Sequence, residues 1–537
     1  MSFEVTLATL PRIQDDIDRL TAAACRAFAG WGNAEAGTSH DPAYFERVLI
    51  RTLIKLVPVL YWELETRDAE TAELAGPDLE TALCDCLGVD FPTFANKIMR
   101  SDSYHAVLRG LVAARMAQRP LPPFPSALSG AQDATAASPT VRQRLSAVGC
   151  RTLLYKVPLL RRDQLRLALR SFGRVNHWFR PHAEIDAPAV DPALRTALRD
   201  HFAKASVDDL PARLQNRARV VFALLAYLLP VETVEALTAH MAWARDMADL
   251  CQPKTLVTGY GLLDAGAFPF YAAECAARGT RLVGWQHGGT YGELATPGRA
   301  ERWERRITDR FVTWGWEDGD PKLFAAPCPR QPLFRRARKP REAPASLLWV
   351  STADSRFNHF IDHTPVGERL HGYFRHQDAI LAQLPSDIAA RLVLRPNRND
   401  FGWGLKEMWA RRLDTPVFSP EGSQILDEAD RCGLVLIDYP GSTAFLECLA
   451  AGIPFIAIFD PGVYQIRPSQ AAAFRGLEQA GVVHTSPETA AGEIARALDD
   501  PEAWQIQPAR RKALEDMRAL AMRRDPGYIR TWLRLIT

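Results

Sequence analysis

The stretch TLVTGYGLLDAGAFPFYAAECAARGTRLVGWQ, residues 255–286, decides the fold class of this 537-residue chain. It begins with a short apolar run, continues through an Ala-rich segment with helical spacing, and ends in a second apolar run, RLVGWQ. A third run follows at 310–314. Short β-prone runs that alternate with helical segments predict a parallel sheet with helices on its faces. We therefore expect an α/β domain of the Rossmann type here.

The same alternation restarts after a connector dense in Pro and Arg at 327–344, PCPRQPLFRRARKPREAP. Further strands are expected at 346–351, 391–394, 433–438 and 454–458, with helices at 367–384 and 442–451. Open parallel sheets bind ligands at the carboxyl ends of their strands. Two such units joined by a connector predict a ligand site in a cleft between them.

Helical patterns flank this α/β core. Apolar residues at three- and four-residue spacing predict a helical N-terminal region over 1–140, in which the Pro- and Ala-rich stretch 119–139 is a linker. A helical segment and the first Rossmann-like domain are expected over 141–330, with helical patterning throughout 140–250. The second Rossmann-like domain is expected over 345–507. The remaining residues, 508–537, are expected to form Arg-rich helices suited to cross back over the first domain.

The composition is that of an ordinary globular protein. Hydrophobic residues make up 47% and charged residues 24%, and the formal charge of +2 gives no support to a nucleic-acid binder. Nine cysteines, without a second pair at zinc spacing, argue against a disulfide framework or a structural zinc site. The N-terminus lacks the pattern of a signal peptide. The longest apolar run, 220–231, is too short to span a bilayer, so a cytoplasmic protein is expected.

The loop after the predicted strand RLVGWQ carries the first candidate for catalysis, QHGGTYG. It places His287 at the carboxyl end of a strand, and an imidazole suits general-base chemistry near neutral pH. Gly288 and Gly289 allow a ligand to approach backbone N–H groups closely, and Gln286 and Tyr291 complete the loop. The alternative is a tight turn in which His287 only hydrogen-bonds the loop.

The segment LVLIDYPGSTAFLE, residues 434–447, carries a second candidate. An apolar run ends in a turn at Gly441, and a helix begins at Ser442 or Thr443. Free N–H groups and the helix dipole make such a helix start a phosphate site. Glu447, one turn further on, is placed to accept hydrogen bonds from ribose hydroxyls. The alternative is an ordinary helix cap with a solvated Glu447.

A third candidate is RPNRND, residues 395–400, which follows the predicted strand RLVL. Arg395, Asn397 and Arg398 at a strand end suit a phosphate, a diphosphate or a carboxylate. For Arg398 a solvated turn is the competing interpretation. Arg395 differs, because a charge directly after an apolar strand must find a partner.

Several common motifs are missing from the sequence. It contains no G-x-x-x-x-G-K-[ST] loop, no G-x-S-x-G elbow and no H-E-x-x-H helix, so ATPase, hydrolase and zinc-protease readings lose support. Asp318 and Asp320 have the D-x-D spacing of a metal site but lie in a predicted turn. Basic runs at 161–174 and 335–341 leave peripheral contact with the inner membrane surface open, beside the alternative of solvated helix and linker faces.

The segment 284–316, GWQHGGTYGELATPGRAERWERRITDRFVTWGW, resembles a family of transferases encoded in bacterial surface-polysaccharide clusters. That family pairs a QHGG-x-YG loop with a downstream D-R-F/L-x-x-W-G-W strand. The matching residues are Gln286, His287, Gly288, Gly289, Tyr291, Gly292, Asp309, Arg310, Phe311, Trp314, Gly315 and Trp316. The combination is specific, whereas the Arg-Pro strand end and the S-T-x-x-x-E helix start are not. We expect Trp314 and Trp316 to pack at the domain boundary.

More distantly, the plan is similar to GT-B glycosyltransferases, in which two Rossmann-like domains face a cleft. The resemblance implies that His287 deprotonates the acceptor hydroxyl. It also implies that Arg395, Ser442 and Thr443 hold the donor phosphate or carboxylate, and Glu447 the ribose. No metal is implied, because GT-B enzymes stabilise the leaving group with helix dipoles and basic side chains.

The resulting hypothesis is an inverting glycosyltransferase with a nucleotide-sugar donor, such as a CMP-activated nonulosonic or 3-deoxy-ulosonic acid, and a surface glycan or protein acceptor. The donor is a substrate, and no cofactor is expected. Three alternatives stay open: a glycerol- or ribitol-phosphate transferase of the same layout, a non-catalytic nucleotide-sugar-binding scaffold, and an epimerase acting on UDP-sugars. All catalytic versions require His287 and the helix start near 442 to face each other.

Overall fold

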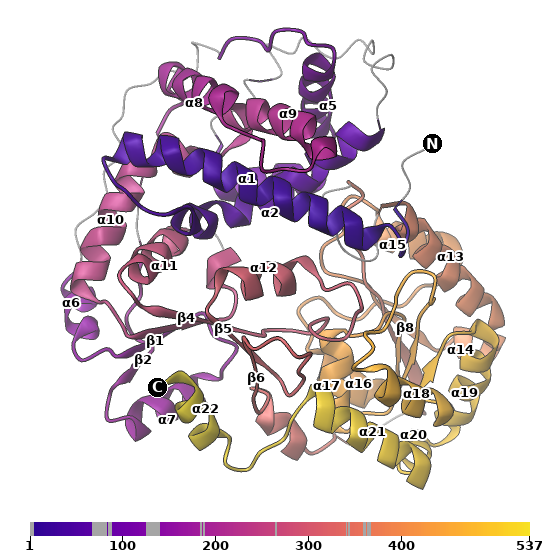
Figure 1. Cartoon of the computed structure of the whole chain (residues 1–537). Coiled ribbons are helices and arrows are strands. Elements are labelled where there is room, and N and C mark those ends of the chain that lie inside the picture. The colour runs from indigo at the N-terminus through magenta and orange to yellow at the C-terminus, as the bar shows by residue number, and fades with distance from the viewer. Residues whose placement is uncertain are drawn as a thin grey trace.

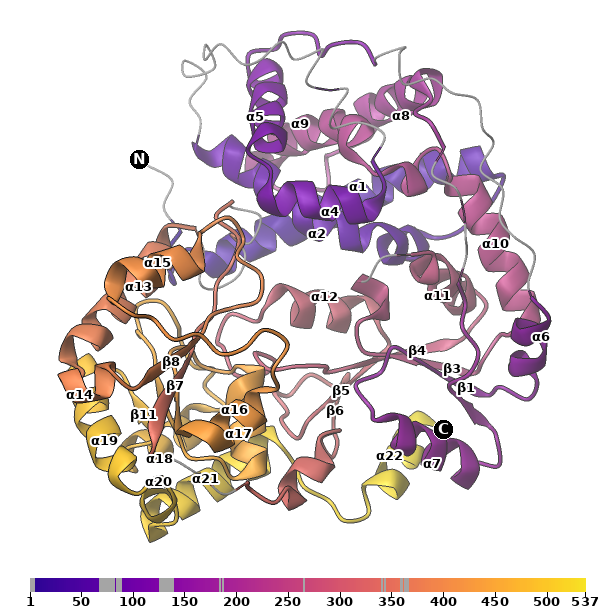
Figure 2. The same ribbon diagram turned by 180° about the vertical axis from the view of Figure 1, so that it is seen from behind.

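The computed structural model describes residues 5–66, 83, 89–124, 140–182, 185, 188–263, 266–339, 341, 344–357, 361 and 367–537. Most of the linker predicted at 119–139, together with Cys84 and Cys86, lies outside these residues. Two parallel sheets form the core of the molecule, with strand orders β2-β1-β3-β4-β5-β6 and β11-β10-β9-β7-β8 (Figures 1 and 2). The predicted α/β fold with two Rossmann-like domains is confirmed.

The first sheet contains two strands that the sequence analysis assigned to helix. Its strands are β1 (Thr152–Tyr155), β2 (Val175–Asn176), β3 (Thr255–Thr258), β4 (Arg281–Trp285), β5 (Arg310–Thr313) and β6 (Leu323–Ala325). The prediction of helical structure throughout 140–250 is wrong for β1 and β2, which pair in parallel with each other, while β1 also pairs in parallel with β3. Four buried residues, TLLY, are too few for periodicity to separate a strand from a helical turn.

The second sheet follows the predicted strands within one residue. It contains β7 (Ser346–Val350), β8 (Leu392–Arg395), β9 (Gly433–Ile437), β10 (Phe455–Ile458) and the unpredicted β11 (Val483–His484). Its helices include α13 (Gly367–Gln383), α15 (Leu405–Arg412), α16 (Ile425–Cys432), α17 (Thr443–Ala451), α18 (Ala471–Gln479), α19 (Pro487–Asp499) and α20 (Pro501–Gln505). Apart from the end of β8, its central strands are buried apolar runs, as expected for parallel strands covered on both faces.

A layer of helices lies above the first sheet in Figure 1 and shares a hydrophobic core with it. It comprises α1 (Leu10–Ala36), α2 (Pro42–Thr66), α4 (Phe91–Arg100), α5 (Asp102–Met116), α8 (Pro192–Lys204), α9 (Ala212–Leu228), α10 (Leu237–Leu250), α11 (Phe268–Ala277) and α12 (Arg299–Ile307). The layer also reaches the second domain. Ser355 Oγ donates to Met99 O over 2.9 Å, and the rings of His105 and Phe357 stack at 3.9 Å. The N-terminal region therefore contacts both domains.

The C-terminal helices are α21 (Pro508–Ala521) and α22 (Tyr528–Ile536), and α22 packs on the first domain. The rings of Trp532 and Trp285 meet edge to face with centroids 5.7 Å apart. Thr152 Oγ1 donates to Ile536 O over 3.1 Å. The chain thus crosses between the domains twice, once in each direction. Among the described residues, no helix has the length and apolar character needed to cross a bilayer.

Candidate active site

His287 directly follows β4, and two buried side chains hold its ring. Tyr291 Oη lies 2.7 Å and Glu304 Oε1 3.2 Å from His287 Nε2, and Tyr291 donates to Glu304 Oε2 over 2.9 Å. Because the tyrosine hydrogen points to the carboxylate, we assign the imidazole proton to Nε2. The other ring nitrogen, Nδ1, then carries the lone pair, and 27% of the His287 side chain is exposed. This is the arrangement of an oriented general base.

Glu304 comes from α12 and was not predicted as a site residue. Burial raises the pKa of the Glu304 carboxyl, while His287 and Tyr291 oppose that shift. Burial also raises the pKa of Tyr291, which keeps its hydroxyl protonated. The available signal was the spacing of Glu301 and Glu304, three residues apart and therefore on one face of the helix.

Gln286 ties the QHGG loop to the WGW segment from a buried position. Its side-chain oxygen accepts from Trp314 N over 2.9 Å and from Trp316 Nε1 over 2.8 Å. Its backbone oxygen accepts from Trp314 Nε1 over 2.8 Å, and its amide donates to Gly288 O over 2.9 Å. Gln286 is therefore a positioning residue that fixes the loop carrying His287, and its side chain is taken up by these bonds within the protein.

The two tryptophans lie where the domains meet, as predicted. Trp314 belongs to the hydrophobic core that includes the second sheet. The guanidinium of Arg467, from the second domain, lies 5.4 Å from the Trp316 ring. Gly292 has a positive φ of 76°, and a Cβ there would lie 2.3 Å from the Trp316 indole. Both facts require glycine at this position.

The glycine pair of the loop touches the start of α17 in the second domain. Gly289 N donates to Thr443 Oγ1 over 3.0 Å, and Thr290 N donates to Gly441 O. A Cβ on Gly289 would lie 2.2 Å from the Gly441 carbonyl oxygen. The His287 loop and the helix start therefore face each other, and they are in direct contact.

Ser442 and Thr443 have different roles at this helix start. Ser442 is the N-cap of α17, because its buried Oγ accepts from Phe445 N over 2.9 Å. The sequence analysis gave a helix cap and a phosphate site as alternatives for this helix start, and Ser442 forms the cap. The Thr443 hydroxyl points instead to the His287 loop, where it accepts from Gly289 N. Gly441 has a φ of 67°, and a Cβ there would collide with the Glu293 carboxylate.

Arg395 ends β8 and is held by neutral acceptors. Its Nη1 donates to Ser419 Oγ and Ser423 Oγ, each over 2.8 Å, and its Nη2 donates to Ser423 O over 2.8 Å. Among the described residues it forms no ion pair. Burial lowers the pKa of Arg395, and the nearby charge of Arg398 adds to this effect. An anionic ligand would supply the missing negative charge.

Glu447 is mostly buried, contrary to the alternative of a solvated side chain. Its Oε1 lies 3.3 Å from Nη2 of Arg330, which belongs to the connector and was not predicted as a site residue. Burial raises the pKa of the Glu447 carboxyl, against the charges of Arg330 and Arg395. The Glu447 carboxylate, predicted to accept from a ribose, therefore lies near two cations, Arg330 and Arg395.

A cavity of about 420 Å³ opens beside these residues. It is lined by Arg395, Pro396, Asn397, Arg398, Lys406, Phe418, Ser419, Pro420, Glu421 and Gly422. Arg398 is exposed at its edge, and Asn397 Oδ1 accepts from Asn399 N over 2.9 Å to close a turn. The volume falls within the range of small-molecule sites. Two arginines and an aromatic ring suit the phosphate and the base of a nucleotide.

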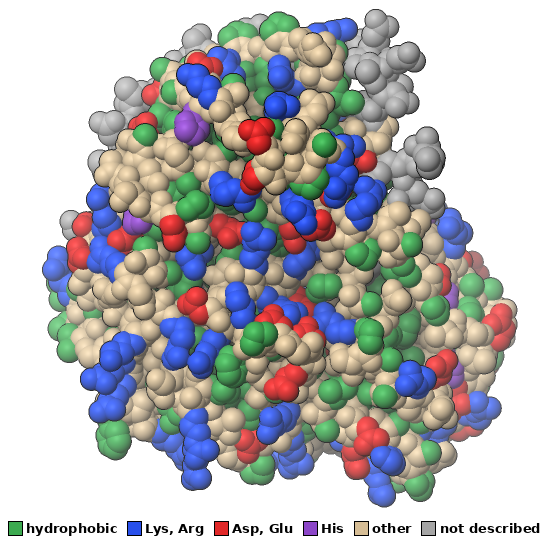
Figure 3. Space-filling model, in the orientation of Figure 1, with side chains coloured by type: hydrophobic (Ala, Val, Ile, Leu, Met, Phe, Trp, Pro, Cys, Tyr) green, Lys and Arg blue, Asp and Glu red, His purple; other side chains and the backbone are tan. Residues whose placement is uncertain are grey.

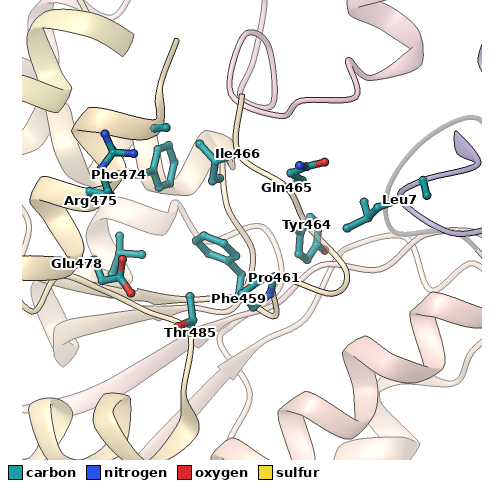
Figure 4. A pocket seen from close by; sticks show the side chains of 13 residues that line it. Leu7, Phe459, Pro461, Tyr464, Gln465, Ile466, Phe474, Arg475, Glu478 and Thr485 are labelled. Carbon is teal, nitrogen blue, oxygen red and sulfur yellow. The ribbon is translucent and has the colours of Figure 1, made fainter. Parts of the chain in front are cut away.

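A larger cavity of about 610 Å³ lies at the carboxyl ends of β10 and β11 (Figure 4). Its side chains include Leu7, Phe459, Tyr464, Ile466, Phe474, Arg475 and Glu478. The lining is largely aromatic and aliphatic, and its cation is accompanied by an acid. It therefore suits a phosphate less well than the cavity beside Arg395.

Two further side chains near His287 were not predicted. The Tyr260 ring, after β3, lies edge-on to the imidazole with centroids 5.7 Å apart. Lys156 Nζ, after β1, lies 5.9 Å from the Tyr260 ring centroid, and burial lowers the pKa of this amine. Because β1 was not predicted, no local pattern indicated that Lys156 lies at the same sheet edge as His287.

Comparison with protein families matches residues 15–536 to the LIC12162 family transferase. The chain belongs to this family of transferases. No curated protein matches the sequence. Several solved structures are similar at low sequence identity, and three of them follow. Their TM-scores are low, so the fold of this chain is assigned from its own strand order. S. aureus MnaA in a co-structure with UDP is 9% identical over 54% of this chain and 75% of that chain, with a TM-score of 0.33.

WaaG, a glycosyltransferase involved in lipopolysaccharide biosynthesis, is 13% identical over 72% of this chain and 99% of that chain, with a TM-score of 0.30. A mutant of the Thermobaculum terrenum O-GlcNAc transferase is 15% identical over 97% of this chain and 98% of that chain, with a TM-score of 0.32. In this LIC12162 family transferase, the loop that follows His287 meets Gly441 and Thr443 at the domain boundary.

Proposed function

We propose that this transferase is an inverting glycosyltransferase, with the base in the first domain and the donor nucleotide in the second. The observation that carries the proposal is the contact of the His287 loop with the start of α17. That helix continues to Glu447 beside Arg330 and Arg395. A base and an unneutralised cationic site thus lie on either side of one boundary, as direct displacement requires.

The first domain acts on the acceptor. The acceptor's hydroxyl oxygen attacks the anomeric carbon of the donor sugar, while the hydroxyl proton passes to His287 Nδ1. The bond from that carbon to the donor phosphate oxygen breaks. The phosphate leaves with the bonding electron pair. Glu304 stabilises the imidazolium that forms and keeps Nδ1 directed outward. Attack opposite the leaving group inverts the anomeric configuration.

The second domain holds the donor. Arg395 and Arg398 bind its phosphate, Glu447 accepts from the ribose hydroxyls, and Phe418 offers a face for the base in the 420 Å³ cavity. Thr443 supplies the hydroxyl at the helix start, while Ser442 remains the cap. Because Gly289 already contacts Thr443, a phosphate at the helix start requires the loop to move away from α17.

A CMP-activated nonulosonic or 3-deoxy-ulosonic acid is the donor class we place first. Such a donor carries two anionic groups, the phosphate and the sugar carboxylate. Among the described residues, the donor side offers two cations without an ion pair for them, Arg395 and Arg398, with Arg330 and its partner Glu447 beside them. A surface glycan or a protein is the acceptor.

Calorimetry of the purified protein with CMP, CDP, UMP and UDP tests the proposal. We expect one nucleotide to bind clearly more tightly than the rest, with CMP first. The sugar donors of that nucleotide are then screened by mass spectrometry for transfer to glycan and peptide acceptors. If none of the four nucleotides binds, the chain is a scaffold that has kept the fold, and the proposal is wrong.

A further inference from the structure

Exposed apolar side chains concentrate in one segment of the first domain. Of the eleven large hydrophobic side chains that are exposed among the described residues, eight lie within 141–178. They are Val141, Leu145, Val148, Leu160, Leu165, Leu169, Phe172 and Trp178. Single exposed apolar residues are ordinary, but a group of this size marks a contact surface. We call residues 140–182 the edge segment, because it contains β2, the edge strand of the first sheet.

The apolar residues of the edge segment form stripes on two helices. On α7 (Arg161–Arg170) and the turn after it, Leu165, Leu169 and Phe172 follow i, i+4, i+7 spacing and share one face. The opposite side of α7 is buried through Leu167. On α6 (Val141–Ala147) the exposed positions 141, 145 and 148 repeat the same spacing. Each helix therefore presents an apolar face to solvent.

Hydrogen bonds hold α6 and α7 along the same sheet edge. Gln143 Nε2 donates to Arg180 O over 3.1 Å, which joins α6 to the chain after β2. Arg151 N and Thr152 N donate to Arg174 O over 3.0 and 2.9 Å, which joins the start of β1 to the turn after α7. Figures 1 and 2 show both helices on the side of the first domain away from the second.

The edge segment is also strongly basic. It contains nine arginines and Lys156 but a single acid, Asp163, in a chain whose total formal charge is +2. Asp163 is buried, where it accepts from Tyr528 Oη over 2.9 Å and pairs with Arg166 over 3.2 Å, so it offsets only one of these cations. All nine arginines are exposed. In Figure 3, Lys and Arg side chains gather along the lower left edge, where Figure 1 places α7.

Phe172 is held outward in an unfavourable backbone conformation. It is 93% exposed and has a φ of 53°. A bulky residue in the left-handed region is an outlier that persists where the surroundings or the function require it. The aromatic ring gains nothing from this position in the isolated chain. A surface that covers the ring would compensate for the strain.

A cationic cavity of about 360 Å³ adjoins the stripe on α7. It is lined by Arg162, Arg166, Gln331, Pro332, Arg335, Arg524, Asp525, Pro526 and Tyr528. Its acid, Asp525, already accepts hydrogen bonds from Gly527 N over 2.6 Å and Thr531 Oγ1 over 2.7 Å. Four arginines from three parts of the chain thus surround a space suited to a phosphate group.

We propose that the edge segment docks the protein on an anionic lipid bilayer. Leu165, Leu169 and Phe172 enter the boundary between headgroups and acyl chains, and the surrounding arginines bind lipid phosphates. The cavity beside α7 receives one headgroup. A bilayer fits this surface because the apolar residues protrude from convex helices, exposed acids are missing from the edge segment, and Trp178 suits the headgroup level.

Vesicle flotation of the full chain tests this proposal. We expect the parent protein to float with vesicles of equal parts phosphatidylcholine and phosphatidylglycerol, and to stay in solution with phosphatidylcholine alone. The double variant Leu169→Ser with Phe172→Ser removes two inserted side chains and should bind the vesicles at least about tenfold more weakly than the parent. Arg162→Gln should weaken binding about fivefold, since one cation near an anionic surface is worth about 1 kcal/mol.

Matched controls lie outside the edge segment. Ile506→Ser removes another side chain that is 66% exposed, and Arg511→Gln removes an exposed arginine of α21; both should bind vesicles like the parent. Thermal melts confirm that each variant folds. Failure of the parent to float, or equal binding to neutral vesicles, would overturn the proposal. Self-association through this face, seen by sedimentation and removed by the double variant, would overturn it in favour of a second copy.

Discussion

The carboxyl ends of the two sheets present opposite kinds of polar groups. In the first domain, buried acids meet internal partners: Glu304 engages His287, and Glu301 accepts from Arg467 Nη2 over 2.8 Å. In the second domain, Arg395 bonds only to neutral oxygens among the described residues, and Arg398 is exposed. Glu304 and Glu301 thus have partners within the protein, whereas Arg395 has no anionic partner among the described residues.

This difference divides the proposed chemistry between the domains. A base works best when its orientation is fixed before the substrate arrives, and the partners of His287 achieve this. An anion site must keep cations unneutralised until the ligand binds. The two sheet ends are therefore specialised for different steps, and each can be perturbed separately.

The largest effect should come from His287→Ala. Loss of a general base costs about 10²- to 10⁴-fold in rate, while nucleotide binding should not change because His287 does not line the cavity beside Arg395. Turnover by mass spectrometry and nucleotide affinity by calorimetry measure the two effects. His371→Ala, at an exposed position of α13, is the control. A variant with undiminished turnover would remove His287 from the role of base.

Arg395→Gln should show the reverse pattern, with the nucleotide dissociation constant raised about 10- to 100-fold. Stability should change little, because Ser419 and Ser423 keep the 3.0 Å contact between their hydroxyl oxygens. Arg391→Gln is the matched control, since Arg391 lies just before the same strand at its amino end and pairs with Asp387. Calorimetry compares the two variants. Equal affinities would contradict a donor site at the carboxyl end.

Gly289→Ala should separate the domains locally. Its Cβ would meet the Gly441 backbone, which cannot yield, so we expect a loss of about 1–3 kcal/mol and a lower melting temperature. Gly288→Ala is the matched control, because its Cβ would lie 3.2 Å from the Thr443 hydroxyl, which can rotate. Calorimetric melts measure both. Identical melting temperatures would argue against tight contact between loop and helix.

The smallest effect should come from Glu293→Gln and should depend on pH. Burial, with the charge of Glu301, raises the pKa of Glu293 to about 8, against the opposing charge of Arg467. The folded protein therefore holds a proton that the unfolded chain releases above pH 4.5, and stability falls as pH rises from there to about 8. Between about pH 7 and 9 the free energy of unfolding of the parent should fall by about 1.4 kcal/mol, whereas that of the variant should not show this fall. Melts at both pH values test this, and parallel losses would contradict it.

Much of the fold was predictable from residue 255 onward. Runs such as LVLI in β9 are bounded by turns and followed by a helical pattern, which strongly favours their assignment to buried strands. The strands β1, β2 and β11 escaped prediction because two to four residues carry no periodicity, and partners far away in sequence define them.

The candidate site was predictable where its signal is local. His287 and Thr443 each lie in a strand-end motif, and the structure brings their segments together. Glu304 and Arg330 reach the site from other segments of the chain, and no local sequence pattern indicates these positions. Gln286 looked like part of the ligand loop, yet its side chain fills a buried space between two tryptophans of a distant segment.

The return of α22 to the first domain means that this domain is not a single continuous piece of chain. Trp285 stands two residues before His287 and rests against Trp532. A fragment that ends before residue 528 would lose the support behind His287, although the QHGG loop itself would be intact. A single proteolytic cut in the short link between α21 and α22 would therefore weaken the opposite domain, some 240 residues earlier in the sequence.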